Sequence, residues 1–229
     1  MNHPLRNSAL NTGLNRQLRQ VVVLLAILIW LPAWSNPGPP AAAALPARMW
    51  IPGPVYMQIG KSCVGYALAA WLDAAPYPIV AHPSGWQIYR AAQDQDGITG
   101  LHDGTTVEAG LAVLARLGYA RDWQATSDPA RALAFLRADG PLVILSGFPD
   151  GPAVLNRNGD LAWSAPQSRH AWLCYSVDAG DRLGCQNSAS SYWNPREGGR
   201  FHMTRAALAS ALAHGRAWLI HKAAAGPAL

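Results

Sequence analysis

The chain has 229 residues, of which 50% are hydrophobic and 14% are charged, and its formal net charge is +5. So small a charged fraction excludes a disordered protein built around acidic or basic tails. The basic residues are scattered and lysine occurs only at Lys61 and Lys222, so the chain lacks the basic stripe that a nucleic-acid partner needs. The 3 cysteines allow at most one disulfide, which excludes a scaffold held together by several bridges.

The N-terminal 45 residues have the composition of a targeting segment. Residues 1–20 form a polar, basic leader, and residues 21–34 (VVVLLAILIWLPAW) carry no charge. This hydrophobic stretch is shorter than the roughly 20 apolar residues that a membrane-spanning helix needs. Residues 36–45 (NPGPPAAAAL) follow as a stiff Pro/Ala linker.

Two interpretations of the hydrophobic segment stay open. Ala33-Trp34-Ser35 has small residues at the spacing that a signal peptidase prefers, which makes residues 21–35 a cleaved signal peptide. The alternative is an uncleaved membrane anchor formed by residues 21–34, and the long basic leader favours it. In a bacterial cell both interpretations place the rest of the chain in a secreted or periplasmic location, where a disulfide can form.

Residues 46–229 are predicted to form one domain in which helices precede strands. Helical spacing and capping residues predict helices over 62–74 and 84–95, a third from the Thr105–Glu108 capping box to Gly118, and a fourth from Asp128 to Gly140. Strands are expected over 142–145, 171–177, 182–187, 200–203 and 216–221, with a short helix capped by Thr204. This order predicts an α+β fold, in which a helical lobe packs on an antiparallel sheet.

Cys63 lies at the predicted start of the first helix. A helix N-terminus favours negative charge, so it lowers the pKa of a thiol and favours the nucleophilic thiolate. The alternative is a small buried hydrophobic residue, which is the commonest fate of a free cysteine.

His170 and Asn187 lie at the outer ends of the predicted hairpin. If Ala179-Gly180 is a two-residue turn, the two residues are diagonal neighbours on one face, about 7–8 Å apart at the backbone. The Asn187 carbonyl could then accept from one ring nitrogen of His170, and the other nitrogen could take the proton of a thiol. With Cys63, this arrangement supplies a nucleophile, a base and an orienting residue.

The same register pairs Cys174 directly with Cys185. Directly opposed strand residues have Cα atoms about 4.5–5.5 Å apart, within the range of a disulfide. A bridge would leave Cys63 as the free thiol, and an extracytoplasmic location favours it. The alternative is two adjacent buried thiols in the core beneath the hairpin.

The residues around these positions resemble the papain-like cysteine peptidases over residues 54–221. The resemblance rests on Gln58 to Ala67 (QIGKSCVGYA), on His170-Ala171, and on Asn187-Ser188 followed by Trp193 and Gly198-Gly199. A middle block over 88–93 (IYRAAQ) and 104–110 (GTTVEAG) is similar to compact phage- and bacteria-associated members. The resemblance implies a papain-like fold in which Cys63 is the nucleophile, His170 the base and Asn187 its orienting partner. It also implies that the Gln58 side chain and the Cys63 backbone N–H bind the oxyanion.

The chain departs from the family pattern at several positions. Gln58 is one residue closer to Cys63 than is usual, and no aromatic residue directly follows Cys63. The family's Asn-Ser-Trp-Gly is here Asn187-Ser188-Ala189-Ser190, so the tryptophan that normally shields the Asn–His hydrogen bond is absent, and Trp193 is the candidate to replace it. His170 follows Cys63 by 107 residues, against about 130–150 in typical members.

These observations predict a cysteine peptidase that acts on a peptide or protein substrate, with no cofactor and no metal. The sequence leaves two alternatives open. One is a cell-wall amide hydrolase of the Cys-His type, and the other is a catalytically inactive papain-fold binding protein. The oligomeric state is not predicted.

Overall fold

The structure, a computed structural model, describes residues 47–74, 79, 81–100, 103–148, 154–162, 168–189 and 193–223. The leader, the hydrophobic segment and the linker lie outside these residues, so their predicted roles stay predictions. In the described part of the chain, no helix has the length and apolar character needed to cross a membrane.

The helices begin close to where their capping residues predict. They are α2 (Cys63–Asp73), α3 (Gly85–Asp96), α4 (Val107–Arg116), α5 (Pro129–Ala138) and α6 (Arg205–Ala213). Ser84 and Gln87 form a reciprocal capping box at α3, while Asp128 and Thr204 cap α5 and α6. The box predicted at Thr105 is wrong, because Thr106 caps α4 by accepting from the Ala109 N–H at 3.1 Å. Thr105 instead donates to Asp96 at 2.7 Å.

The strands form one antiparallel sheet in the order β2-β7-β3-β4-β5-β6. The short strand β1 pairs with the C-terminal end of β4. They are β1 (Arg48–Met49), β2 (Ala120–Thr126), β3 (Leu142–Phe148), β4 (Ser168–Val177), β5 (Leu183–Gln186), β6 (Arg200–Met203) and β7 (Arg216–Lys222). The sequence predicts five of these strands and misses β1 and β2. Because β2 lies between α4 and α5, the predicted separation of helices from strands is only partial.

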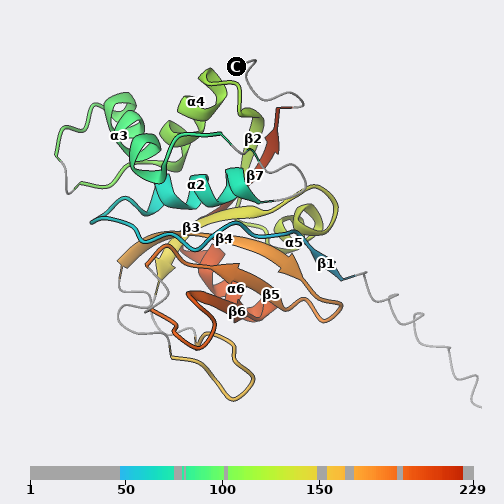
Figure 1. Cartoon of the computed structure of the whole chain (residues 1–229). Coiled ribbons are helices and arrows are strands. Elements are labelled where there is room, and N and C mark those ends of the chain that lie inside the picture. The colour runs from blue at the N-terminus through green and yellow to red at the C-terminus, as the bar shows by residue number, and fades with distance from the viewer. Residues whose placement is uncertain are drawn as a thin grey trace, which may run out of the picture. The chain divides into compact units, whose positions relative to one another are not determined.

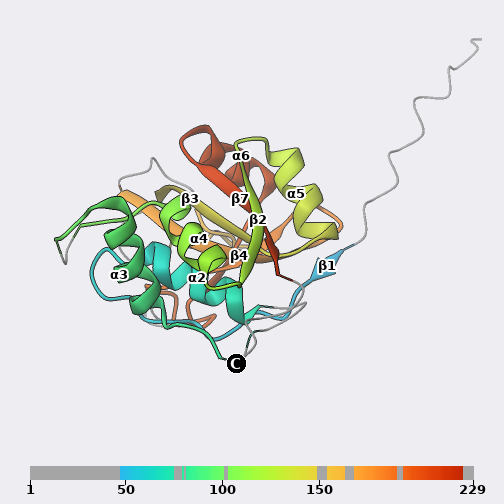
Figure 2. The ribbon, with the colours of Figure 1, turned by 90° about the horizontal axis from the view of Figure 1, so that it is seen from above.

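Helices cover both faces of this sheet, so the fold is α+β. Figure 1 shows α2, α3 and α4 on one face and α6 on the other, and Figure 2 shows α5 beside α6. One core cluster joins α2 and α4 to Val143, Ala171, Leu173 and Trp218 of the sheet. A second cluster joins α5 and α6 to alternate residues of the same strands, among them Ile144, Trp172 and Cys174. This alternation is the period of two that a strand imposes on its side chains.

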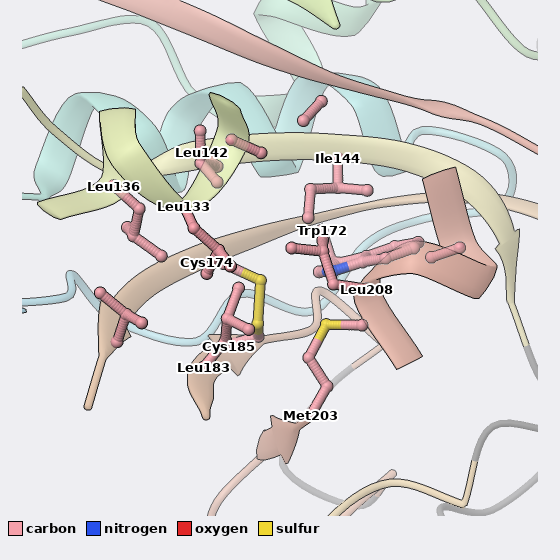
Figure 3. Close-up of a cluster of buried hydrophobic side chains, with 14 of the residues drawn as sticks. Leu133, Leu136, Leu142, Ile144, Trp172, Cys174, Leu183, Cys185, Met203 and Leu208 are labelled. Carbon is pink, nitrogen blue, oxygen red and sulfur yellow. A yellow bond between two sulfur atoms is a disulfide. The ribbon is translucent and has the colours of Figure 1, made fainter. Parts of the chain in front are cut away.

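Cys174 and Cys185 form a disulfide in the second core cluster, as Figure 3 shows. Their Cα atoms are 3.9 Å apart, and both residues are fully buried. The bridge joins β4 to β5, so the alternative of two free thiols is wrong. Cys63 is the free cysteine of the chain.

The β4–β5 hairpin has this pairing of cysteines although its turn and its register both differ from the prediction. The two-residue turn Ala179-Gly180 is wrong, because the Asp178 carboxylate accepts from the N–H groups of Gly180 and Arg182 at 2.8 and 2.9 Å and widens the loop. A register shift between Cys174 and Ser176 then moves the pairing by one residue. The two deviations cancel, so Cys174 still pairs with Cys185.

Candidate active site

Cys63 is the first residue of α2, and its side chain faces the sheet. The hydroxyl of the preceding Ser62 donates a hydrogen bond to the Ile59 carbonyl at 2.6 Å, and the Ser62 side chain makes no capping hydrogen bond to the helix. Backbone N–H groups of Ala171 in β4, of Val64 and of Cys63 itself approach the thiol. The nucleophile candidate is therefore held between the start of a helix and the strand that carries His170.

The electrostatic state of this thiol differs from the expectation. Cys63 is 8% exposed, and burial raises the pKa of the Cys63 thiol more than the three N–H groups lower it. The lowered pKa expected from the helix N-terminus is thus not found, because desolvation of the thiolate outweighs the favourable dipoles. A thiol in this state needs a base to become a nucleophile.

His170 and Asn187 are joined by a hydrogen bond of 2.5 Å between Nε2 and Oδ1. The same Asn187 oxygen accepts from the Ala189 N–H at 3.1 Å. Because a backbone N–H can only donate, the atom it meets is the carbonyl oxygen of the amide, and His170 Nε2 must carry the proton. In the neutral ring Nδ1 is then the nitrogen with a lone pair, and it is the atom that can act as a base.

Aromatic rings cover the His170–Asn187 pair. The Phe148 ring lies 5.0 Å from the His170 ring, centroid to centroid, and Trp172 stacks on His170 at 6.5 Å. Asn187 is 2% exposed. Trp193, the candidate to replace the missing tryptophan, packs on Phe148 with the ring centroids 5.5 Å apart. Among the described contacts it therefore supports Phe148, and Phe148 is the ring that covers His170. The sequence did not identify Phe148, because it comes from β3 and its ring meets His170 only when that strand pairs with β4.

Gln58 lies beside the segment that carries Asn187. Its backbone N–H donates to the Ser188 carbonyl at 2.7 Å, and the Ser188 hydroxyl donates to its side-chain oxygen at 2.7 Å. The amide nitrogen donates to the Gly60 carbonyl at 2.9 Å, which uses one of its two hydrogens. Gly60 has φ of +58°, a left-handed conformation that glycine adopts without steric cost.

Cys63, His170 and Gln58 all line one cleft with a volume of about 780 Å³. One wall comes from Gly104 to Thr106 and Glu108 at the start of α4, and the floor comes from Leu145, Arg169, Arg216 and Trp218 of the sheet. The buried Gln93 of α3 supports the first wall by donating to the carbonyls of Gly100 and Asp103, both at 2.8 Å. Gln93 belongs to the block of residues 88–93 on which the family resemblance rests. The sequence did not indicate its role in supporting the cleft wall.

The structure thus brings together all four predicted site residues. Cys63, His170 and Gln58 share the cleft, and Asn187 contacts it through His170. In the described part of the chain, no group of three or more His, Cys, Asp or Glu residues has an arrangement suited to a metal ion.

The chain has the papain-like fold, because solved structures of cysteine proteases match its arrangement of helices and antiparallel sheet. Xylellain, a cysteine protease from Xylella fastidiosa, matches with a TM-score of 0.59 and 17% identity, over 76% of this chain and 86% of that chain. The Carica candamarcensis cysteine protease in complex with E-64 matches with a TM-score of 0.54 and 12% identity, over 76% of this chain and 99% of that chain.

A digestive procathepsin L from the Tenebrio molitor larval midgut matches with a TM-score of 0.52 and 13% identity, over 80% of this chain and 73% of that one. No protein-family model and no curated protein matches the sequence.

Proposed function

We propose that the chain is a cysteine peptidase of the papain-like type that hydrolyses peptide bonds outside the cytoplasm. The observation that carries the proposal is the hydrogen bond between His170 and Asn187, on a histidine that lines the same cleft as Cys63. Asn187 holds the proton on Nε2, so Nδ1 can accept a proton on the same cleft that Cys63 lines. The Cys174–Cys185 disulfide supports an oxidising compartment.

The reaction begins with proton transfer from the Cys63 thiol to His170 Nδ1. The sulfur attacks the scissile carbonyl carbon and forms a C–S bond, and the developing oxyanion is bound by the Cys63 N–H and the second amide hydrogen of Gln58. His170 then gives its proton to the leaving amine as the C–N bond breaks. Water, deprotonated by His170, attacks the thioester, which releases the acid and restores the thiol.

A catalytically inactive binding protein of the same fold is the second candidate. It is favoured by the Gln58 side chain, whose amide donates to Gly60 in its own loop. A cell-wall amide hydrolase would use the same Cys63–His170 chemistry on another substrate, so only the choice of substrate separates it from a peptidase.

The test combines labelling with turnover. Wild-type protein should react at Cys63 with a thiol-directed peptidyl inhibitor such as E-64 and should cleave denatured casein. Cys63→Ala should do neither, while its circular dichroism and thermal midpoint stay close to those of the wild type. Cleavage of peptidoglycan without cleavage of casein would support the cell-wall hydrolase. Absence of turnover on both substrates, with correctly folded protein, would support the inactive binding protein.

A further inference from the structure

Two arginine side chains belong to the floor of the cleft. Arg216 begins β7 and pairs with Leu145 of β3, which also pairs with Ala171 of β4. Directly paired residues of an antiparallel sheet share a face. Arg169 precedes Ala171 by two positions, so it lies on that face as well.

This face is the one that approaches the nucleophile. The Ala171 N–H interacts with the Cys63 thiol, and Arg169, Arg216 and Cys63 all line the same cleft. Gly147, the residue paired with Arg169, adds no side chain to this face. The two guanidinium groups therefore belong to the surface over which a substrate must lie when it reaches Cys63.

Neither arginine is neutralised by the part of the protein that the structure describes. Within the described residues, Arg169 and Arg216 have no hydrogen-bond or ion-pair partner, and both are exposed. Other arginines of the chain do have such partners, since Arg137 binds Asp181 at 2.5 Å and Arg182 binds Asp160 at 2.6 Å. The cations on the cleft floor thus differ from the arginines that stabilise the fold.

The described residues that line the cleft carry a net positive charge. Lys61 precedes α2, and it joins Arg169 and Arg216 as a third cation in the lining. Glu108 at the start of α4 is the anion of the lining and belongs to the helical wall rather than to the sheet. A substrate with negative charge should therefore be favoured at the floor, where two exposed guanidinium groups line the same cleft.

We propose that Arg169 and Arg216 form a subsite that binds the carboxylate of an Asp or Glu side chain of the substrate, so that the enzyme selects acidic peptides. This inference rests on the proposed peptidase function. A guanidinium group offers a planar fork of donors that matches a carboxylate. Leu145 and Trp218 line the cleft beside the two arginines and offer apolar surface to the methylene groups of such a side chain.

The test is a positional-scanning library of fluorogenic peptides, in which one position at a time carries Glu, Gln or Lys. At one position the wild type should cleave the Glu peptides at least about fivefold faster than the Gln peptides, as expected for a charge-assisted pair. This ratio should fall as NaCl is raised from 20 to 500 mM, because salt screens exposed charges. The double variant Arg169→Glu/Arg216→Glu should reverse the preference toward Lys.

Arg157→Glu is the matched control, since Arg157 is exposed and is not part of the cleft lining. It makes one of the two charge changes of the double variant and should keep the wild-type preference. Cleavage by the wild type without an acidic preference at any position would overturn the inference. A preference that persists unchanged in the double variant would overturn it too.

Peptidyl thiol-directed probes that carry Glu, Gln or Lys separate this inference from the proposed function. If the wild type cleaves no peptide, the proposed function fails, and the rates at which these probes label Cys63 still measure the subsite. Faster labelling by the Glu probe would support the acidic subsite, and equal rates for the three probes would exclude it.

Discussion

Ser188 donates its hydroxyl to the side-chain oxygen of Gln58 at 2.7 Å, across 130 residues of sequence. Together with the backbone bond between the same two residues, this contact orients the Gln58 amide beside the cleft. It links the segment before the nucleophile to the segment that carries Asn187. The segment that carries Gln58 and the segment that carries Asn187 are therefore held side by side, and an isolated bridge between Met57 and Ala189 adds to this contact.

Gln58→Ala should lower kcat by about 10²-fold or more, the loss expected for one oxyanion donor. Ser188→Ala should lower kcat less, about tenfold, because it frees the amide to rotate without removing it. Ser188→Thr keeps the hydroxyl and should recover most of the activity, which a purely structural role of the site would not predict. Alkylation of Cys63 by a small reagent should be unchanged in all three variants. An unaltered kcat in Gln58→Ala would remove Gln58 from the mechanism.

His170→Ala should abolish peptide hydrolysis as completely as Cys63→Ala, because His170 is the proposed base for the thiol proton and lines the same cleft as Cys63. Asn187→Ala should retain more activity, since Asn187 fixes the tautomer of His170 and does not accept the proton. The checking measurement is kcat/KM for the three variants on one fluorogenic peptide. A larger loss in Asn187→Ala than in His170→Ala would contradict the assigned roles.

Burial raises the pKa of the Cys63 thiol in the resting protein, so the thiol should be mainly protonated at neutral pH. Alkylation by iodoacetamide requires the thiolate and should therefore keep rising with pH beyond the ordinary thiol value of about 8.5. Because Cys63 is the free cysteine, the incorporated label reports on it alone. A rate that is already constant between pH 5 and 8 would indicate a preformed thiolate and would exclude this assignment.

The unreduced, denatured protein should contain one titratable thiol per chain, and the reduced protein three. The bridge closes a loop with a sequence separation of 11, so its reduction should lower the free energy of unfolding by about 3 kcal/mol. Urea denaturation with and without a reductant measures this difference. Cys63→Ala should respond to the reductant in the same way and should titrate as zero thiols before reduction. Three thiols before reduction would show that the bridge is not formed.

Lys222 should make stability rise with pH in the alkaline range. Its ammonium group donates to the carbonyls of Leu72 and Ala74 at the end of α2, at 2.8 and 2.6 Å, and burial lowers the pKa of Lys222 to about 8. In the unfolded chain the group titrates near its ordinary value of 10.5. Between these values the unfolded state binds more protons, so the free energy of unfolding increases with pH.

Lys222→Met removes this titration while keeping an unbranched side chain. The stability difference between the wild type and Lys222→Met should shift in favour of the wild type from pH 8 to 10.5, as measured by urea denaturation. Between pH 5 and 7 the difference should be constant, since Lys222 is protonated in both states. A difference that stays constant up to pH 10.5 would show that the Lys222 pKa is not lowered.

The elements that the sequence predicts well are those defined by local residues. Ser84, Asp128 and Thr204 cap their helices through neighbours two or three residues away, so the signal for each helix start is contained in its own segment. The edge strand β2 has no such signal. Its polar sequence ARDWQAT is strand only because Trp123 to Thr126 pair with β7, almost 100 residues later.

The residues of the candidate site could be proposed from the sequence where a local pattern or the family resemblance pointed to them. Position at a helix start indicated Cys63, and the hairpin together with the family resemblance indicated His170 and Asn187. The state of the thiol was not predictable, because the desolvation that raises its pKa comes from strands distant in sequence. Arg169 and Arg216 lie on one cleft floor because β7 pairs with β3 and β3 pairs with β4. No local sequence pattern predicts these strand pairings, so the sequence did not indicate the two arginines.

The position of β7 makes two parts of the molecule, the sheet and the cleft, depend on one strand. β7 is the last strand in the described part of the chain, yet it pairs with β2 on one side and with β3 on the other. A chain that lacked residues 216–222 would therefore leave β2 unpaired in the described sheet, because β7 is the strand that joins β2 to β3. Because Arg216 and Trp218 also line the cleft, the same strand supplies part of the cleft floor. A truncation that removes β7 should thus disrupt the sheet and the candidate site together.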